Sequence, residues 1–368
     1  MYTTLAKQHY GEELGAAAIF FRSIAAEIDQ DPNAILQYLD HPALILLRQD
    51  RSDNTLNKVK LYEALAYGDT ACLFASPRPC LSGLLLKEIG TEAQYEAYHQ
   101  NVRENSPRTC FAVTEPLYGS DVAKMESFFT FNYQENIWHL NGHKYLFGNG
   151  TCADIGVVWA RVSPGPFGIR AALIRFKENA TETNIERSLL PMLGLRGAQL
   201  SSVKFNNFPI HVEDMLGLHV HSLLRGINAL VRTFNKMRIC IAALAIGQSQ
   251  AICDYIQTVK KSFTNQEAAL LKQYQVKIDA LRQRIGQAAV RLDEDPERVA
   301  EISLLKSLAT TLVEGLVNEM FSFFGQAAFF EHPFLAKSFR DAFAYEFADG
   351  TIHVQRNNIF EGYQSESL

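Results

Sequence analysis

The sequence predicts an α+β protein in which a block of β-strands separates two blocks of helices. Three observations support this fold class. Apolar residues recur at helical spacing up to residue 108, short aromatic and β-branched runs fill residues 109–217, and long helical patterns return from residue 218. We therefore expect an N-terminal α-helical domain over residues 1–108, a middle β domain over 109–217, and a C-terminal long-helix bundle over 218–368.

The first block contains helices with clear start and stop signals. The runs GEELGAAAIFFRSIAAEI (11–28) and NKVKLYEALAYG (57–68) place apolar side chains three and four residues apart, which gives a helix one buried face. Gly90 favours the end of one helix. Thr91 and Glu92 favour the start of the next, because Thr caps free amides and an acid complements the positive helix end.

The second block reads as short strands separated by turns, which is typical of a barrel or a sandwich. The dipeptide Asn141-Gly142 divides the run IWHLNGHKYLFG and predicts a type I′ hairpin turn. The other strand candidates are ESFFTFNY (126–133), IGVVWARV (155–162), IRAALIRF (169–176) and VKFNNFPI (203–210).

The third block contains three long helical patterns, over residues 226–263, 270–292 and from Asp295-Pro296-Glu297 to Gly325. Asp is a favourable cap and Pro is favourable at a first helical position, so we expect the third helix to begin at this tripeptide. A short helix, a turn at Asp349-Gly350 and a final helix complete the block.

Composition excludes several classes of protein. Of 368 residues, 47% are apolar and 20% are charged, which excludes global disorder, and the net charge of −5 argues against a nucleic-acid binder. The six cysteines contain no C-x-x-C pair and fit neither a zinc site nor a disulfide framework. We expect reduced, buried thiols, a cytoplasmic location, no metal, no signal peptide and no membrane span.

Six ordered stretches between residues 66 and 356 resemble the acyl-CoA dehydrogenase family. Within the fifth and sixth stretches, the family positions are matched by Arg238 and by the sequence RDA…DGT. The stretches are AYGDTACLFA with KEIGTEAQYEAYHQNV, FAVTEPLYGSD, LNGHKYLFGNGTCADIGVVWARV, MLGLRGAQLSSVKFNNFPIHVEDMLG, RICIAALAIGQSQAICDY and RDAFAYEFADGTIHVQR.

The resemblance implies the acyl-CoA dehydrogenase-like fold, with a middle β-barrel, and an FAD cofactor. The implied reaction oxidises an acyl thioester between its α and β carbons. A carboxylate removes the α proton, the β hydrogen leaves as hydride to the flavin, and hydrogen bonds stabilise the developing enolate charge.

The resemblance also implies which residues bind FAD. Gly119 lets backbone amides approach an anion, hydroxyl groups donate to the cofactor, and Phe263 reaches the FAD of a neighbouring subunit. The positions carried over are Phe111, Val113, Thr114, Gly119, Ser120, Leu146, Gly148, Lys260, Phe263, Gly325 and Thr351.

The family's catalytic base falls on Asp349, nine residues after Arg340. Relatives that carry the base on the first long helix have it at the position of Met237, which cannot accept a proton. Arg238 matches an arginine near the base, and we assign it to the substrate side of the site. Two simpler interpretations remain open: an ordinary D-G turn at Asp349 and a helix salt bridge at Arg238.

Several positions depart from the family pattern. Leu146 and Gly148 replace an aromatic residue and a hydroxyl residue over the flavin, and Lys260 replaces an arginine. Thr264 and Gln326 stand where the family has glycines. These departures indicate a divergent member.

The sequence therefore favours FAD-dependent α,β-dehydrogenation of an acyl thioester carried by CoA or by an acyl carrier protein, with Asp349 as base. The first alternative is a flavin-dependent acyl thioester oxidase or monooxygenase of the same fold, and the second is a non-catalytic paralogue with an assembly role. The resemblance implies a homotetramer or homodimer, with an electron-transfer flavoprotein or oxygen as electron acceptor.

Overall fold

The computed structural model describes residues 2–51 and 54–366. A helical block forms its N-terminal part, and α6 begins where the sequence predicts. The Thr91 side chain accepts a hydrogen bond from the Gln94 backbone amide, and the Gln94 side-chain oxygen accepts one from the Thr91 backbone amide. The block comprises α1 (Tyr2–Gln30), the 3-10 helix η1 (Pro32–Tyr38), α2 (Pro42–Arg48), α3 (Thr55–Gly68), α4 (Thr70–Ala75), α5 (Cys80–Ile89) and α6 (Glu92–Asn105).

The middle of the chain forms one curled sheet of seven strands within the described residues. Strand order is β1-β4-β2-β3-β7-β6, with β5 antiparallel to β4. The strands and their short helical connections are β1 (Thr109–Ala112), η2 (Val122–Lys124), β2 (Phe128–Asn132), β3 (Ile137–Phe147), β4 (Ile155–Arg161), η3 (Pro166–Gly168), β5 (Ile169–Arg175), α7 (Phe176–Asn179), β6 (Ile185–Leu189), η4 (Arg196–Ala198), β7 (Ser201–His211) and η5 (Val212–Asp214).

The predicted hairpin turn at Asn141-Gly142 is wrong. Strand β3 continues through both residues, and its pairing with β7 shifts register there, so the dipeptide marks a β-bulge. Gly142 has a φ of +145°, and a Cβ at this position would lie 2.1 Å from the Ser127 Oγ atom. The Asn141 side chain bonds to Asn207 of β7 instead of shaping a turn.

Long helices form the C-terminal part. The third of them, α10, begins at Val299 and not at Pro296, because Asp295 instead ends α9 and its side chain accepts a bond from the Glu297 amide. The helices are α8 (Ile227–Val259), α9 (Asn265–Glu294), α10 (Val299–Phe324), α11 (Ala327–Phe330), α12 (Pro333–Ala342), α13 (Ala344–Phe347) and α14 (Ile352–Glu366).

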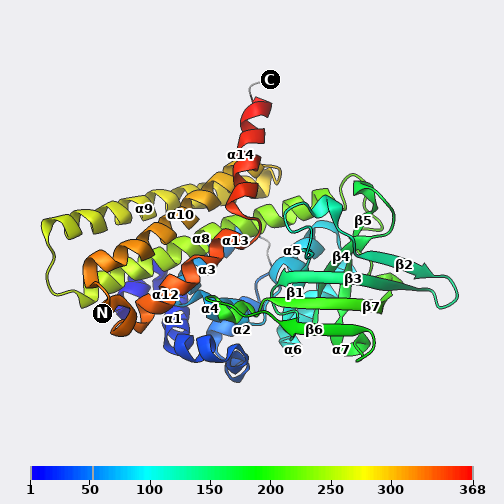
Figure 1. The fold of residues 1–368 in the computed structure, drawn as a ribbon, viewed down its shortest axis with the longest axis horizontal. Helices are drawn as coiled ribbons and strands as arrows, with labels where there is room; N and C mark the ends of the chain where they lie inside the picture. Colours follow the sequence, from blue (N-terminus) through cyan, green and yellow to red (C-terminus); the bar gives the residue numbers. More distant parts are fainter. Residues whose placement is uncertain (1, 52–53, 367–368) are drawn as a thin grey trace.

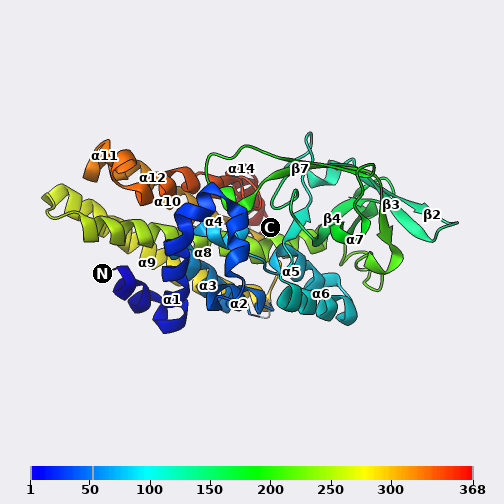
Figure 2. The same cartoon turned by 90° about the horizontal axis from the view of Figure 1, so that it is seen from below.

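Helix α8 connects the two halves of the molecule. It runs from the side of the sheet into the bundle, where it packs against α3, α9 and α10 (Figures 1 and 2). Its length and composition would suit a membrane span, but 94% of its most apolar window is buried in the protein, as in the central helix of a core.

Two faces of the sheet are buried in separate cores. Phe111 and Val113 pack toward α5, α6 and the start of α8, whereas Cys110 and Ala112 pack into the interior of the curled sheet. This alternation is the period of two expected for a strand buried on both faces. The helical core is continuous from α1 through α8 to α12.

Candidate active site

Asp349 lies in the turn between α13 and α14. Its φ is +53°, in the left-handed region that Asp and Asn tolerate better than most residues, and Gly350 follows with a φ of +102°. The residue is half-buried, and burial raises the pKa of its carboxyl group above the usual value. The positive charges of Lys306, Arg238 and Arg78 act in the opposite direction and limit that rise.

Three buried side chains hold this turn by its backbone. The Lys306 ammonium donates to the carbonyl oxygens of Ala348 and Gly350. The Arg238 Nε donates to the Asp349 carbonyl at 2.9 Å, and the Gln355 Nε2 donates to the Gly350 carbonyl at 3.0 Å. Because the donors take backbone oxygens, the Asp349 carboxylate keeps its lone pairs for a proton.

Lys306 was not identified from the sequence. It lies on α10 with no exposed surface, and burial lowers its pKa to about 8 despite the nearby Asp349 carboxylate. The signal available was a lone lysine in the apolar run ISLLKSLATTLV, which a helix places on the same face as Ile302 and Ala309. A lysine on the buried face of a helix requires acceptors nearby.

Arg238 and Thr351 are close to the predicted base, as the sequence analysis expected. Arg238 also donates to the Asn235 side chain at 3.1 Å and lies over the Phe234 ring, which in turn packs edge-on against Phe111 of β1. Thr351 precedes α14, and its hydroxyl accepts a bond from the Val354 amide at 3.4 Å. One continuous set of contacts therefore joins Asp349 to the first strand of the sheet.

The predicted flavin segment, residues 111–121, is anchored beneath by a buried ion pair. Lys144 of β3 lies 2.7 Å from Glu115 and also donates to the Val113 carbonyl at 3.0 Å. Glu115 accepts further bonds from the amides of Glu126 and Ser127. The anchor fixes the start of the segment and leaves its end at the surface.

The exposed part of this segment fits the needs of a flavin nucleotide. The hydroxyl groups of Thr114 and Ser120 have no hydrogen-bond partner among the described residues, and a Cβ at Gly119 would meet only the Thr114 methyl group, at 3.6 Å. Leu146 is 50% exposed and Leu117 is 75% exposed. Free donors beside exposed apolar groups suit a polar, aromatic cofactor.

The other predicted cofactor residues of the sheet are less accessible. The side chains of Phe111 and Val113 are buried in the core, Phe111 pairs with Val157 of β4, and the Val113 carbonyl accepts the bond from Lys144. Gly148 is half-buried, and a Cβ there would lie 3.0 Å from the Ala198 carbonyl oxygen. The position therefore accepts a larger side chain only with a local shift.

Within one chain, the fold does not place three of the predicted cofactor residues near the sheet: Lys260, Phe263 and Gly325. They lie at the α8–α9 and α10–α11 connections, at the end of the bundle away from the strands (Figure 1). Lys260 donates to the Phe323 carbonyl at 2.8 Å and pairs with Glu267 at 3.1 Å. Within one chain these residues therefore lie apart from the segment 111–121.

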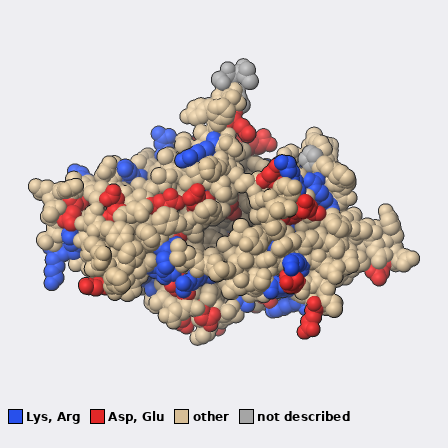
Figure 3. Space-filling view, in the orientation of Figure 1, with Lys and Arg blue, Asp and Glu red and all other residues tan. Residues whose placement is uncertain are grey.

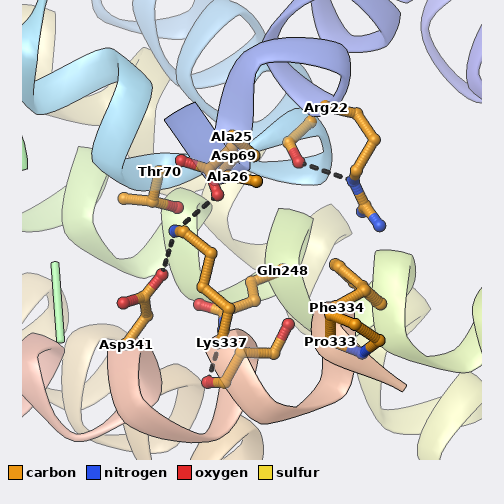
Figure 4. Close-up of a pocket in the computed structure, with 13 residues that line it drawn as sticks. Arg22, Ala25, Ala26, Asp69, Thr70, Gln248, Pro333, Phe334, Lys337 and Asp341 are labelled. Carbon is orange, nitrogen blue, oxygen red and sulfur yellow. Dashed lines mark hydrogen bonds and ion pairs between the residues drawn. The ribbon is translucent and has the colours of Figure 1, made fainter. Parts of the chain in front are cut away.

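The RDA sequence orients α12, the helix that precedes the Asp349 turn. Asp341 accepts the Leu195 amide at 2.6 Å, and Arg340 pairs with Asp29 at 2.6 Å. Lys337 lies between the carboxylates of Asp341 and Asp69, 2.6 Å from each, beside a cavity of about 170 Å³ between α1, α3, α8 and α12 (Figure 4). This cluster fixes α12 and has no direct contact with Asp349.

The surface is hollowed where the helical bundle meets the sheet (Figure 3). The described residues contain no group of three or more His, Cys, Asp or Glu side chains arranged to hold a metal ion. The arrangement thus offers a half-buried carboxylate at Asp349, several buried cations and an exposed segment with free hydroxyl groups. These are the components of proton abstraction next to a bound organic cofactor.

Comparison with known proteins identifies the family. Residues 110–208 match the model of the acyl-CoA dehydrogenase middle domain, and residues 225–364 match that of the acyl-CoA dehydrogenase C-terminal domain. A short-chain specific acyl-CoA dehydrogenase of Megasphaera elsdenii is 25% identical over 318 residues, which are 83% of this chain and 81% of the relative.

Solved structures share the fold over nearly the whole chain. A glutaryl-coenzyme A dehydrogenase in complex with glutaryl-CoA has a TM-score of 0.82 at 20% identity and covers 99% of this chain and 95% of its own. The prolyl acyl carrier protein oxidase AnaB has a TM-score of 0.84 at 18% identity and covers 98% of this chain and 99% of its own. The chain belongs to the acyl-CoA dehydrogenase family of flavin oxidoreductases, whose cofactor is FAD.

Proposed function

We propose that this protein dehydrogenates an acyl thioester between its α and β carbons, with Asp349 as the catalytic base. The observation that carries the proposal is the Asp349 turn: a carboxylate with a raised pKa, held by buried donors that bind its backbone and leave its oxygens free. A base works best when its pKa approaches the working pH, and burial moves Asp349 in that direction.

The reaction converts two C–H bonds of the acyl chain into one C=C bond. Asp349 takes the α hydrogen as a proton, and the β hydrogen departs with its electron pair as hydride. FAD, when bound, accepts that hydride. Lys306 and Arg238 keep the carboxylate in one position and place positive charge near the enolate that develops as the proton leaves.

Binding of FAD is assigned to two parts of the chain. Thr114, Gly119 and Ser120 supply donors and a close backbone approach, and Leu146 with Gly148 forms the apolar wall beside them. The second part, formed by Lys260, Phe263 and Gly325, belongs to a neighbouring copy, so we infer a homodimer or a dimer of dimers. Thr351 precedes α14 close to both the base and the cofactor.

An oxidase is the second candidate, and one observation favours it. Leu146 is half exposed and Gly148 has no side chain, so the surroundings assigned to the flavin are open. One structural neighbour is itself an oxidase of a carrier-bound acyl group. The acyl carrier is CoA or a carrier protein, the electron acceptor is an electron-transfer flavoprotein or oxygen, and we place the enzyme in the cytoplasm.

Anaerobic mixing of the FAD-loaded protein with acyl thioesters tests the proposal. Wild-type protein should lose its flavin absorbance, while Asp349→Asn, which keeps the shape and tolerates the left-handed backbone, should retain FAD and its colour. Bleaching of Asp349→Asn at the wild-type rate would place the base elsewhere. A protein that never binds FAD would support the non-catalytic alternative.

A further inference from the structure

Exposed apolar side chains gather around the loop that leads into α8. Leu218, Leu223 and Leu224 of this loop are 56%, 54% and 53% exposed, and Phe167 of η3 is 68% exposed. A single exposed leucine is ordinary on a protein surface, whereas several neighbouring ones mark an interaction site.

Contacts between two loops bring these side chains to one place. A Cβ atom at Gly226 would lie 3.1 Å from the Ile169 carbonyl oxygen, so the start of α8 lies against the start of β5 (Figure 1). The Arg225 Nη1 donates to the carbonyl oxygens of Gly217 and Leu218, at 2.9 and 3.4 Å, which holds the rest of the loop there. The resulting surface, which we call the α8 entry patch, consists of Phe167, Arg170, Leu218, Leu223, Leu224 and Arg225.

The two arginines of the patch have no acidic partner. Arg170 and Arg225 are half-buried and donate to backbone carbonyl oxygens, and neither forms an ion pair with a carboxylate of the described residues. Arg232, farther along α8, is by contrast paired with Glu88 at 3.0 Å. The patch therefore carries uncompensated positive charge around an apolar centre, although the net charge of the whole chain is −5.

Exposed apolar groups elsewhere lack this combination. Leu189 of β6 is 58% exposed, but the charges on the same pair of strands are balanced, since Lys204 pairs with Glu186 at 3.0 Å. Phe330 of α11 is 81% exposed and lies at the end of the bundle away from the sheet (Figure 1). Exposure alone therefore does not distinguish the α8 entry patch, whereas exposure together with unpaired cations does.

Helix α8 links the patch to the candidate active site. It starts at Ile227 beside the patch, and Arg238, which binds the Asp349 carbonyl, lies eleven residues farther on. At about 1.5 Å per residue this separation is roughly 17 Å. A phosphopantetheine arm has about thirteen bonds between its phosphorus and its sulfur, and at ~1.2 Å per bond it spans roughly 16 Å. An arm of this length can join a thioester at Asp349 to a carrier seated on the patch.

We propose that the α8 entry patch docks an acidic acyl carrier protein, which presents the acyl thioester on its phosphopantetheine arm. The inference rests on the proposed function of the site. Unpaired arginines attract acidic side chains over a distance, and the exposed apolar groups supply the centre that a protein interface needs. CoA carries the same arm but ends in a nucleotide, which would pair with the arginines and leave the four apolar side chains in water. The apolar centre therefore favours a carrier protein over CoA.

The test measures binding to the FAD-loaded enzyme by calorimetry with three ligands that undergo no reaction. They are an acidic acyl carrier protein without its arm, the same carrier with the arm ending in a free thiol, and CoA. Arg225→Gln removes a charge, and the double variant Leu218→Asn, Leu224→Asn removes apolar surface. Each should raise the Kd of both carrier forms at least tenfold, as expected for residues near the centre of an interface, and change the Kd of CoA less than twofold.

Matched variants outside the patch serve as controls. Leu189→Asn replaces a leucine of similar exposure, and Lys204→Gln removes a surface charge, so both should bind all three ligands as wild type does. Arg225 also holds the carbonyls of its own loop. The double variant changes only exposed side chains and therefore keeps the test decisive if Arg225→Gln does not fold.

Several outcomes overturn the proposal. They are the absence of carrier binding to wild type at low salt, and equal carrier Kd values in wild type and the double variant. A higher Kd for CoA alone in Arg225→Gln would assign the patch to the nucleotide of CoA. A change in sedimentation of the double variant with unchanged carrier binding would assign it to contact between copies of the chain. Failure of every acyl thioester to bleach the flavin, with carrier binding intact, overturns only the dehydrogenase proposal.

Discussion

The Arg238 guanidinium binds the backbone carbonyl of Asp349, with an Nε–O distance of 2.9 Å, and does not form an ion pair with its carboxylate. The distinction matters for catalysis, because a carboxylate bound directly by an arginine is a weaker base. Arg238 thus holds the backbone of Asp349 in place and adds positive charge nearby, while the carboxylate oxygens of Asp349 remain available to accept a proton.

Replacing Arg238 should misplace the base without removing it. We expect Arg238→Met to slow flavin reduction by acyl thioester roughly 10- to 100-fold, since errors near 1 Å in the position of a catalytic group have effects of this size. Stopped-flow measurement under anaerobic conditions gives the rate. Arg232→Met, on the same helix but paired with Glu88 at 3.0 Å, is the control and should react at the wild-type rate. An Arg238→Met rate equal to wild type would show that the turn holds without this bond.

Replacing Lys306 should change the pH dependence of flavin reduction. Lys306 lowers the pKa of Asp349, so Lys306→Met should raise that pKa further. The base must be ionised to act, so activity is lost as pH falls through its pKa, and the acid limb of the profile should move to higher pH in the variant.

The alkaline side of the same profile provides a second measurement. The pKa of Lys306 is about 8, so wild type should lose this cation as pH rises through 8, and the rate should change there. Lys306→Met has no such group and should lack that change. Identical profiles for the two proteins over the whole pH range would contradict the role assigned to Lys306.

Removing Lys144 should destabilise the protein and release FAD. Lys144→Met leaves the buried Glu115 without its cation, which typically costs about 3–5 kcal/mol of unfolding free energy. Denaturant unfolding and the flavin content of purified protein measure the two effects. Lys204→Met breaks a surface pair with Glu186 and should cost about 1 kcal/mol or less. Equal losses in the two variants would mean that the buried pair is not a specific anchor.

The open surroundings of Leu146 predict fast reaction of the reduced flavin with oxygen. Reduced wild-type protein, without product bound, should reoxidise within seconds in air-saturated buffer, since a half-exposed leucine leaves oxygen access to the flavin. Leu146→Trp should slow reoxidation at least severalfold, and Leu218→Trp, at an exposed leucine outside the assigned site, should not. Reoxidation of wild type over minutes would argue for a dehydrogenase closed to oxygen.

The start and end of an element could be predicted from the sequence where neighbouring residues alone determine the backbone conformation. Thr91 caps α6 because its hydroxyl is the nearest acceptor for the free amides. The prediction at Asn141-Gly142 was wrong because the same dipeptide suits both a tight turn and a bulge. The choice depends on Ser127, the residue before β2, which packs against Gly142. No local pattern contains that contact.

The candidate site could be predicted only in part. The resemblance to the family pointed to Asp349 as the candidate base, which stays a prediction, but it gave no sign of the left-handed backbone or of the buried donors around it. Lys306 lies more than 40 residues from Asp349 in the chain, and its role depends on the packing of α10 against the final turn. A lone lysine or arginine in an apolar segment indicates burial, and only the fold shows what it faces.

Phe263 lies at the end of the bundle away from the sheet, and this position predicts how two inactive variants behave when they are mixed. If a neighbouring copy supplies Phe263 to each flavin, every complete site draws its base and its aromatic wall from different chains. Asp349→Asn and Phe263→Ala should then complement one another. When the two inactive proteins are dissociated, mixed and reassembled, about one quarter of the sites should become active. Half of the random dimers are hybrids, and each hybrid has one site in which both residues are intact. Protein made from either variant alone should show none of this complementation.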